Sequence, residues 1–268
     1  MVALIGATAV GKTALSLSIA EKLNAEIISV DSRQVYRYMD VGTDKVSLSL
    51  RREIPHHMID IVDPDEKFTV SDFAERTVKA VSRIFARKKI PLFVGGTPFY
   101  YNALFHASLN SELPSDDNVR EKYRTLVNSQ GAELLHMRLA EVDPETAERL
   151  HKNDVTRVTR ALEIWDLTGK APSQIFNEGE KRDYGFDERF NPLKGLGYRE
   201  LIECHRGKIN LHEALEASIS RTKAFCRRQQ TWFKKFEPAI WFEMSESNHE
   251  EEIFNAIQDH LCNEDNPE

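Results

Sequence analysis

The sequence predicts an α/β fold, in which a parallel sheet is flanked by helices and a small all-helical insertion is attached. The first observation is an apolar run at 2–5 that leads directly into the glycine-containing loop GATAVGKT. The second is the alternation of short apolar runs with helical patterns up to about residue 105, which is typical of a parallel sheet. The third is a charged, helix-patterned stretch at 114–172 that contains no good strand.

The elements of the first half follow in order from local patterns. The run at 2–5 has β-branched residues and ends at Gly6, as a buried parallel strand does. A helix is expected directly after the loop, and AEIISV is expected to be a second strand that ends at Asp31. A further helix, from near Ser71, leads to a third strand, IPLFV, which ends in the turn GGT.

The second half begins with the predicted insertion. Asp143 followed by proline is a typical helix start, and Val158, Leu162 and Trp165 share one helix face. The α/β core is therefore expected to comprise residues 1–113 and 173–268, with 114–172 as the helical insertion.

The chain is expected to end in a long helix and a last strand. The helix is predicted from Leu211 to Phe236, and AIWFEM, near 239–244, is predicted to be the strand. The apolar side of the helix would comprise Leu211, Leu215, Ile219 and Phe225.

Composition excludes several classes of protein. The 268 residues are 41% hydrophobic, which is enough for a sizeable core, and the net charge of −7 means that any nucleic-acid site must be a local patch. The three cysteines are far apart and have no metal-binding spacing, which fits a reducing cytosol. No apolar run approaches the ~18 residues of a membrane span, and the first strand leaves no room for a signal peptide. We therefore expect a cytoplasmic protein without a membrane partner. We also expect the protein to be a monomer.

The loop GATAVGKT predicts a phosphate site and a P-loop NTPase-like sheet. Two glycines let the backbone curl so that its N–H groups point at phosphate oxygens, and the following helix adds its positive end. Lys12 supplies a charge, and the Thr13 hydroxyl is the expected Mg2+ ligand. The motif leaves open whether a diphosphate or a triphosphate is bound. The predicted phosphate-binding residues are Gly6, Ala7, Thr8, Ala9, Val10, Gly11, Lys12 and Thr13.

Two further residues follow predicted strands at the edge where ligands bind in such sheets. Asp31 is interpreted as a structural cap, a Mg2+-holding acid or a general base, since an aspartate of ordinary pKa is ionised near neutrality and can accept a proton from a positioned amine. Thr97 follows two glycines, so its hydroxyl can approach a ligand closely, although it also suits an N-cap for the next helix.

These residues belong to longer motifs that resemble the tRNA dimethylallyltransferases. The motifs are GATAVGKT, VDSRQVYRYMDVGTDK, PHHMIDIVDP, FTVSDF, IPLFVGGTPFYYNAL, VDPETAERLHKNDVTRVTRALEIWDLTGK, LGYRELI and RRQQTWFKKF, in the family's order over nearly the whole chain. A C-terminal zinc finger of the eukaryotic kind is missing, so the chain is similar to the bacterial type.

The resemblance implies a reaction and a set of residues. The family moves a dimethylallyl group from dimethylallyl diphosphate to the N6 amine of adenosine 37 beside the tRNA anticodon, with Mg2+ assisting departure of pyrophosphate. By this resemblance Asp31 is the base, Thr97 acts at the reacting centre and Arg199 reaches the pyrophosphate. The residues expected to contact the anticodon stem-loop are Asp31, Ser32, Arg33, Gln34, Thr156, Arg157, Arg160, Arg227, Arg228 and Gln229.

The stretch at 221–235 gives independent support for an RNA surface. It contains six lysines or arginines and no acid in a chain that is negative overall, although a solvated helix face is the alternative. Trp232 and Phe233 suit base stacking or core packing. For His56 and His57 we favour packing and hydrogen bonding.

The sequence departs from the family pattern at one place. Where the family has several tens more residues after GKAPSQ, this chain has only IFNEGEKRDY. Either a core strand is absent or a segment is missing from the sequence, and the exposed edge that a lost strand leaves favours the second.

Three other functions share part of the pattern. An isopentenyltransferase that acts on free adenine nucleotides has the same donor site but less use for the basic stretch. A small-molecule P-loop kinase leaves VDSRQVY and GGTPFYY unexplained, and a protein that only binds nucleotide or RNA leaves Asp31 and Thr97 idle.

Overall fold

The computed structural model describes residues 2–105, 113–176, 198–236, 239–243 and 249–264. The chain divides into two compact units, one made of Met1–Ala107 with Arg189–Glu268 and one made of Ser108–Glu188. Each unit is described by itself below. The first has the sheet, and the second has helices only in its described residues.

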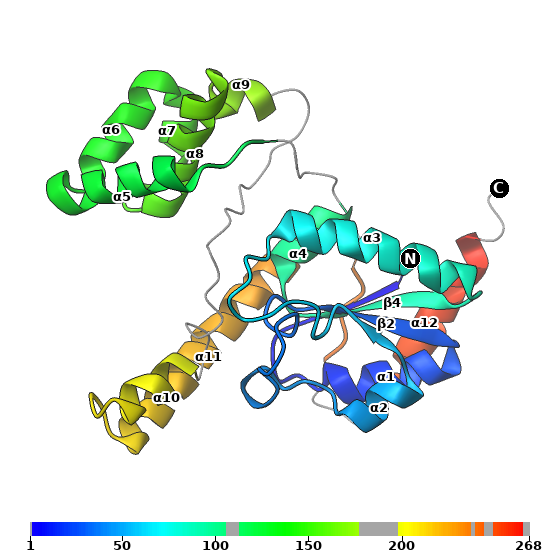
Figure 1. The fold of residues 1–268 in the computed structure, drawn as a ribbon. Coiled ribbons are helices and arrows are strands. Elements are labelled where there is room, and N and C mark those ends of the chain that lie inside the picture. The colour runs from blue at the N-terminus through cyan, green and yellow to red at the C-terminus, as the bar shows by residue number, and fades with distance from the viewer. Residues whose placement is uncertain (1, 106–112, 177–197, 237–238, 244–248, 265–268) are drawn as a thin grey trace. The chain divides into compact units, whose positions relative to one another are not determined.

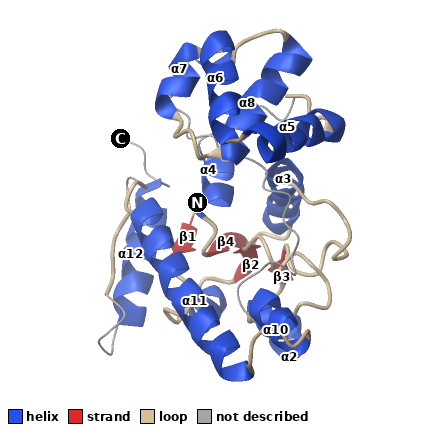
Figure 2. Ribbon diagram, turned by 90° about the vertical axis from the view of Figure 1, so that its left-hand side faces the viewer, coloured by secondary structure: helices blue, strands red, loops and turns tan. Residues whose placement is uncertain are grey.

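The first unit is built on a parallel sheet of four described strands in the order β1-β4-β2-β3. Figure 2 shows them side by side. The strands are β1 (Val2–Ile5), β2 (Ala25–Val30), β3 (His56–His57) and β4 (Ile90–Gly95). The first three strands predicted from the sequence are confirmed as β1, β2 and β4. The two-residue β3 was missed because PHHM carries no strand-like run.

Helices cover both faces of this sheet (Figure 1). On one face α3 (Val70–Ala86), α4 (Pro98–Phe105) and the end of α11 (Leu211–Phe233) pack on Ile28, Val30 and Phe93. On the other face α1 (Lys12–Lys22) and α12 (His249–Glu264) pack on Val2, Ile27 and Leu92. The alternation of Ile27 and Ile28 between the two faces is the strand period of two, and it explains why β2 reads as a continuous apolar run.

Shorter elements complete the first unit. They are the 3-10 turn η1 (Val41–Thr43), α2 (Leu48–Glu53) and α10 (Tyr198–His205). The two histidines of β3 are held as expected: His57 Nε2 lies 2.7 Å from Glu26 Oε2, and His56 Nδ1 lies 2.7 Å from the Ile54 carbonyl oxygen.

The second unit packs α5 (Asp117–Gln130), α6 (Ala132–Val142), α7 (Pro144–Arg149), α8 (Val155–Thr168) and α9 (Pro172–Phe176). Its apolar core includes Tyr123, Leu135, Leu139, Val158 and Leu162. Asp143 caps α7 by accepting from the Thr146 N–H at 3.0 Å, and Pro144 takes the first helical position.

Two predictions for the C-terminal part are wrong. Residues 239–243 form no strand, and their side chains do not alternate between core and solvent as the pattern suggested: Ile240 and the adjacent Trp241 are both exposed, while Phe242 packs on the core. Leu211, Leu215 and Ile219 are each at least half exposed, because only the end of α11 packs on the sheet. Of the short segment after GKAPSQ, Ile175 and Phe176 end α9, and the remainder lies outside the described residues.

Candidate active site

Three loops meet at the carboxyl edge of the sheet. Ile5 at the end of β1 and Val30 at the end of β2 both pair with Gly95, which ends β4 between them. The residues that follow, Gly6, Asp31 and Gly96, therefore start three neighbouring loops. In an open parallel sheet this edge is where ligands bind.

The phosphate loop runs from Gly6 to the first turn of α1. Gly11 lies directly before α1 with a φ of +85°, which an L side chain rarely adopts, so this glycine is needed for its conformation. Gly6 differs, since an added Cβ would meet only ordinary contacts at 3.5 Å and beyond. Ala9 is left-handed although it is not glycine, with a φ of 65°, so the loop holds a strained residue.

Lys12 lies over this loop rather than in solvent. Its Nζ donates to the carbonyl oxygen of Ala7 at 2.5 Å. Burial lowers the pKa of Lys12 from 10.5 to about 8, although the nearby charge of Asp31 acts to raise it. A partly desolvated ammonium in a curled backbone loop is suited to hold an anion.

Asp31 and Thr97 lie beside the phosphate loop and are fixed by backbone groups. Asp31 Oδ1 accepts from the N–H groups of Arg33 at 2.7 Å and Gln34 at 3.1 Å, so both bonds use one carboxylate oxygen. Thr97 Oγ1 accepts from the Ser32 N–H at 3.2 Å. The threonine hydroxyl thus links the β4 and β2 loops. Thr97 also lies directly before α4, where its carbonyl oxygen accepts from the N–H groups of Tyr100 and Tyr101, which is the position that the N-cap interpretation gives it. Asp31 forms the turn that suits its capping interpretation, and this leaves its other oxygen for a further role.

The glycine pair of the β4 turn brings these loops together. A Cβ on Gly95 would lie 2.1 Å from the Val30 carbonyl oxygen, and a Cβ on Gly96 would lie 2.5 Å from Gln229 Nε2. The contact at Gly95 is with backbone, so that position has no room for a side chain, whereas a Cβ at Gly96 would require the end of the Gln229 side chain to shift. The sequence GGT after a strand was the signal of this close approach.

Gln229 points into the site from α11. Its side chain is 3% exposed, and Oε1 accepts from both the Thr8 N–H, at 2.9 Å, and the Thr8 hydroxyl, at 3.2 Å. Its Nε2 donates to the Gly96 carbonyl oxygen. Cys226, one turn earlier, approaches the Thr8 carbonyl oxygen with its Sγ at 3.5 Å. This inward position gives no support to the expected contact of Gln229 with RNA, and neither contact with the phosphate loop was foreseen.

The other expected RNA contacts have varied surroundings. Arg227 and Arg228 are exposed beside Gln229. Gln34 is used internally, since its Oε1 accepts from Ser29 and its Nε2 donates to the Thr43 carbonyl oxygen. Arg199 forms its ion pair, at 3.2 Å, with Glu203 on the same helix rather than with the phosphate loop.

In the helical unit, the three predicted contacts differ in exposure. Thr156 is exposed and Arg157 is partly exposed, with Nε 3.5 Å from Asp154 Oδ2. Arg160 is mostly buried: its Nη1 donates to the Pro114 carbonyl oxygen at 2.9 Å and to Glu163 Oε2 at 2.7 Å. Glu163 is fully buried and also pairs with Arg120, so Arg160 is part of the packing of this unit.

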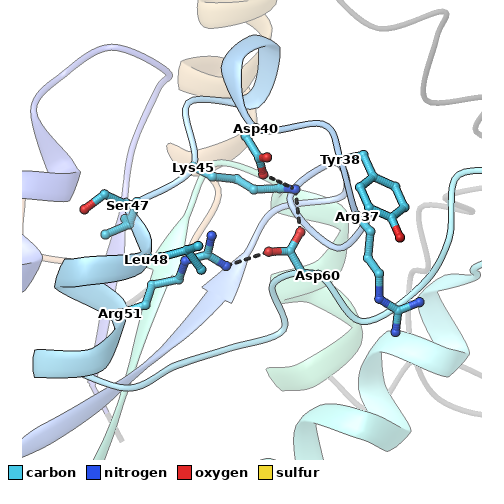
Figure 3. A pocket seen from close by; sticks show the side chains of 9 residues that line it. Arg37, Tyr38, Asp40, Lys45, Ser47, Leu48, Arg51 and Asp60 are labelled. Atoms are coloured by element: carbon cyan, nitrogen blue, oxygen red, sulfur yellow. Dashed lines mark hydrogen bonds and ion pairs between the residues drawn. The ribbon is translucent and has the colours of Figure 1, made fainter.

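A pocket lies beside the segment that follows Gln34 (Figure 3). Lys45, whose side chain is 1% exposed, pairs with Asp40 at 3.0 Å and with Asp60 at 2.6 Å, and Arg51 pairs with the other oxygen of Asp60 at 2.6 Å. Burial alone would raise the pKa of Asp60, but the hydrogen bonds from Arg51 and Lys45 outweigh it and lower the pKa. These paired charges fix the fold of the segment.

The described residues contain no cluster of three or more histidine, cysteine or acidic side chains suited to a metal. The oxygen groups near the phosphate loop, the Thr13 hydroxyl and Asp31, fit Mg2+, which is usually held by one or two protein groups together with substrate phosphates. Within those residues, no helix has both the length and the apolar character needed to cross a bilayer.

Comparison with known proteins agrees with this arrangement. A model of the IPP transferase family matches residues 34–191 and 180–236, and one described as isopentenyl transferase matches 1–51. The chain belongs to the IPP transferase family. The tRNA dimethylallyltransferase of Dictyoglomus turgidum is 38% identical, with 91% of this chain and 87% of that protein covered.

Solved structures show the same family. The tRNA isopentenylpyrophosphate transferase of Bacillus halodurans matches with a TM-score of 0.67 and 34% identity, over 98% of this chain and 96% of the other. A eukaryotic dimethylallyltransferase that acts on tRNA matches with a TM-score of 0.80 and 27% identity, over 98% of this chain and 79% of the other. The chain thus has the P-loop NTPase-like fold of this family, as the sequence predicted.

The relatives are longer within the matched region. The alignment with the Dictyoglomus protein extends over 283 positions, more than the 268 residues of this chain. The relative therefore has residues that lack a counterpart here. This agrees with the departure noted between GKAPSQ and LGYRE.

Proposed function

We propose that this chain transfers a dimethylallyl group from dimethylallyl diphosphate to the N6 amine of adenosine 37 in a tRNA anticodon loop. One observation carries the proposal: the phosphate loop, Asp31 and Thr97 begin three neighbouring loops at one edge of the sheet. Membership of the IPP transferase family and the similarity to tRNA dimethylallyltransferases support the substrate class.

The phosphate loop is the proposed donor site. The Lys12 ammonium and the start of α1 hold the diphosphate and stabilise the charge that grows on it as the carbon–oxygen bond breaks. Arg199 is proposed to approach the same group when the donor is bound. Thr13 would hold Mg2+, which, when bound, neutralises charge on the leaving pyrophosphate.

Asp31 is the proposed base. Its Oδ1 is fixed by two backbone N–H groups, and its charge acts on the nearby Lys12 ammonium. The N6 nitrogen forms a bond to the allylic carbon, pyrophosphate leaves, and the N6 proton passes to Asp31. Because the amine is a weak nucleophile, its placement by Asp31 and Thr97 matters more than the basicity of either group.

The acceptor is proposed to be the anticodon stem-loop, with the adenine turned out of its stack to reach the buried donor. Arg227 and Arg228 are exposed next to the site and suit phosphate contacts. Ser32 and Arg33, and separately Thr156 and Arg157 of the predicted insertion, are proposed as further contacts with the tRNA. The protein is proposed to act in the cytoplasm as a monomer, with 1–113 and 173–268 as the core.

Asp31→Asn tests this assignment, because it keeps the acceptor for the turn and removes the base. We expect transfer to tRNA to fall at least 100-fold, as general bases contribute roughly that much, while the dissociation constant of dimethylallyl diphosphate changes less than threefold. If Asp31→Asn lost binding of dimethylallyl diphosphate as well as transfer, Asp31 would be assigned to the phosphate or metal site instead.

A further inference from the structure

We infer that Gln229 is a positioning residue that fixes the phosphate loop from α11, so that its loss weakens binding of the diphosphate rather than of the RNA. This inference rests on the proposed binding of a diphosphate at the loop. It assigns to Gln229 a role different from the surface contact that its neighbours Arg227 and Arg228 suggest.

The first support is that the oxygen and the nitrogen of the buried Gln229 amide both form hydrogen bonds. Gln229 is 3% exposed, its oxygen receives two bonds from Thr8, and its nitrogen donates to Gly96. A buried amide without partners is costly, so this side chain is tied to one arrangement of the two loops. Its side chain thereby joins the loop after β1 to the turn after β4.

The second support is the conformation of the loop itself. Ala9, next to Thr8, has a left-handed φ of 65°, which is unfavourable for a residue with a Cβ. A strained conformation persists only where its surroundings determine it. The bond from the Thr8 N–H to Gln229 Oε1 lies directly before the strained residue. It therefore fixes the backbone of the loop where the strain is held.

The third support is the rigid mounting of Gln229. Phe233, one turn further along α11, is fully buried and meets Tyr101 of α4 edge to face, with 6.1 Å between ring centroids. Gly96 has no Cβ, and one added there would lie 2.5 Å from Gln229 Nε2. The packing of Phe233 thus holds this part of α11 in place, and the absence of a side chain at Gly96 allows Gln229 to approach the turn.

Gln229→Met tests the inference, because methionine keeps the length and volume but forms none of the three bonds. Gln230→Met is the matched control, since it makes the same chemical change at the next, exposed position of α11. Binding of inorganic pyrophosphate by calorimetry, the KM for dimethylallyl diphosphate and the KM for tRNA are measured for each, with thermal unfolding as a check of folding.

We expect Gln229→Met to raise the pyrophosphate dissociation constant and the donor KM at least tenfold, while the KM for tRNA changes less than threefold. Gln230→Met should change none of these more than twofold. Should Gln229→Met fail to fold, Gln229→Asn serves the same comparison, because its amide is too short to span Thr8 and Gly96.

Two results would overturn the inference. One is unchanged pyrophosphate affinity in a folded Gln229 variant, even if its melting temperature falls, since that describes a packing role only. The other is a raised KM for tRNA with an unchanged donor KM, which would make Gln229 an RNA contact. Failure of the unaltered protein to bind pyrophosphate would instead count against the proposed function.

Discussion

Replacing Lys12 by methionine is expected to stabilise the protein without ligand while it abolishes pyrophosphate binding. Burial in the phosphate loop lowers the pKa of Lys12 from 10.5 to about 8. At 1.36 kcal/mol for each pKa unit, the buried ammonium costs about 3 kcal/mol of folding free energy near neutral pH. Methionine keeps most of the apolar stem and removes the charge, so the melting temperature at pH 7 should rise by roughly 5 °C.

The lowered pKa of Lys12 determines how its contribution to folding stability changes with pH. Below pH 8 the lysine is protonated in the folded and unfolded states, so the full cost is present. Between pH 8 and 10.5 the unfolded chain binds more protons than the folded chain, so the contribution of Lys12 to stability rises with pH. The advantage of Lys12→Met should therefore shrink as pH rises through this window.

Thermal unfolding from pH 7 to pH 10 and calorimetry with pyrophosphate measure both effects. Lys67→Met is the control, since Lys67 is exposed on the same unit and its replacement should leave stability and binding unchanged. A lower melting temperature for Lys12→Met at pH 7, or pyrophosphate affinity equal to that of the unaltered protein, would refute this account of the loop.

Three further predictions concern the surroundings of the loop. Gly95→Ala should lower the melting temperature strongly or prevent folding, because the new Cβ would lie 2.1 Å from the Val30 carbonyl oxygen. The expected loss of folding free energy is about 3 kcal/mol or more. Gly6→Ala is the control, since Gly6 has room for a Cβ, and equal stability of the two variants would count against this contact. Pyrophosphate should slow alkylation of Cys226, followed by peptide mass spectrometry, because its Sγ lies 3.5 Å from the Thr8 carbonyl oxygen, whereas the rate at the exposed Cys262 should stay the same. Changing Arg227 and Arg228 together to glutamine should reduce the salt dependence of tRNA binding by about one unit of slope for each lost phosphate contact, and an unchanged slope would show that these residues face away from RNA.

The α/β core was predictable because its signals are local. A strand that ends in GATAVGKT, and strands that end at Asp31 and at GGT, place their polar residues at one edge whatever the rest of the chain does. The structure adds the register that makes the three loops neighbours. It also gives the reason for the glycine pair: Gly95 lies against the Val30 backbone and Gly96 against the Gln229 side chain, contacts that no single motif contains.

The direction in which each side of α11 faces was not predictable from the sequence. The stripe of Leu211, Leu215 and Ile219 has helical spacing and predicts a buried face, yet the helix extends past the sheet and leaves these residues exposed. Gln229 lies within a basic run and suggests a polar surface, yet it is buried. Period alone shows which residues share a face, and only the packing partners decide whether that face is covered.

The prediction of a last strand near 239–244 was wrong for a related reason. AIWFEM has strand composition, but composition does not supply a neighbouring strand, and in the structure residues 239–243 pair with none of the described strands. β1 has β4 on one side and ends the described sheet on the other.

A transfer assay tests the central claim most directly. The purified protein, Mg2+ and radiolabelled dimethylallyl diphosphate are incubated in parallel with unmodified tRNA, with the same tRNA carrying guanosine at position 37, and with AMP. We expect label in the unmodified tRNA only, released as N6-isopentenyladenosine on digestion to nucleosides. Label in AMP instead of tRNA, or ATP turnover without transfer to either, would contradict the account.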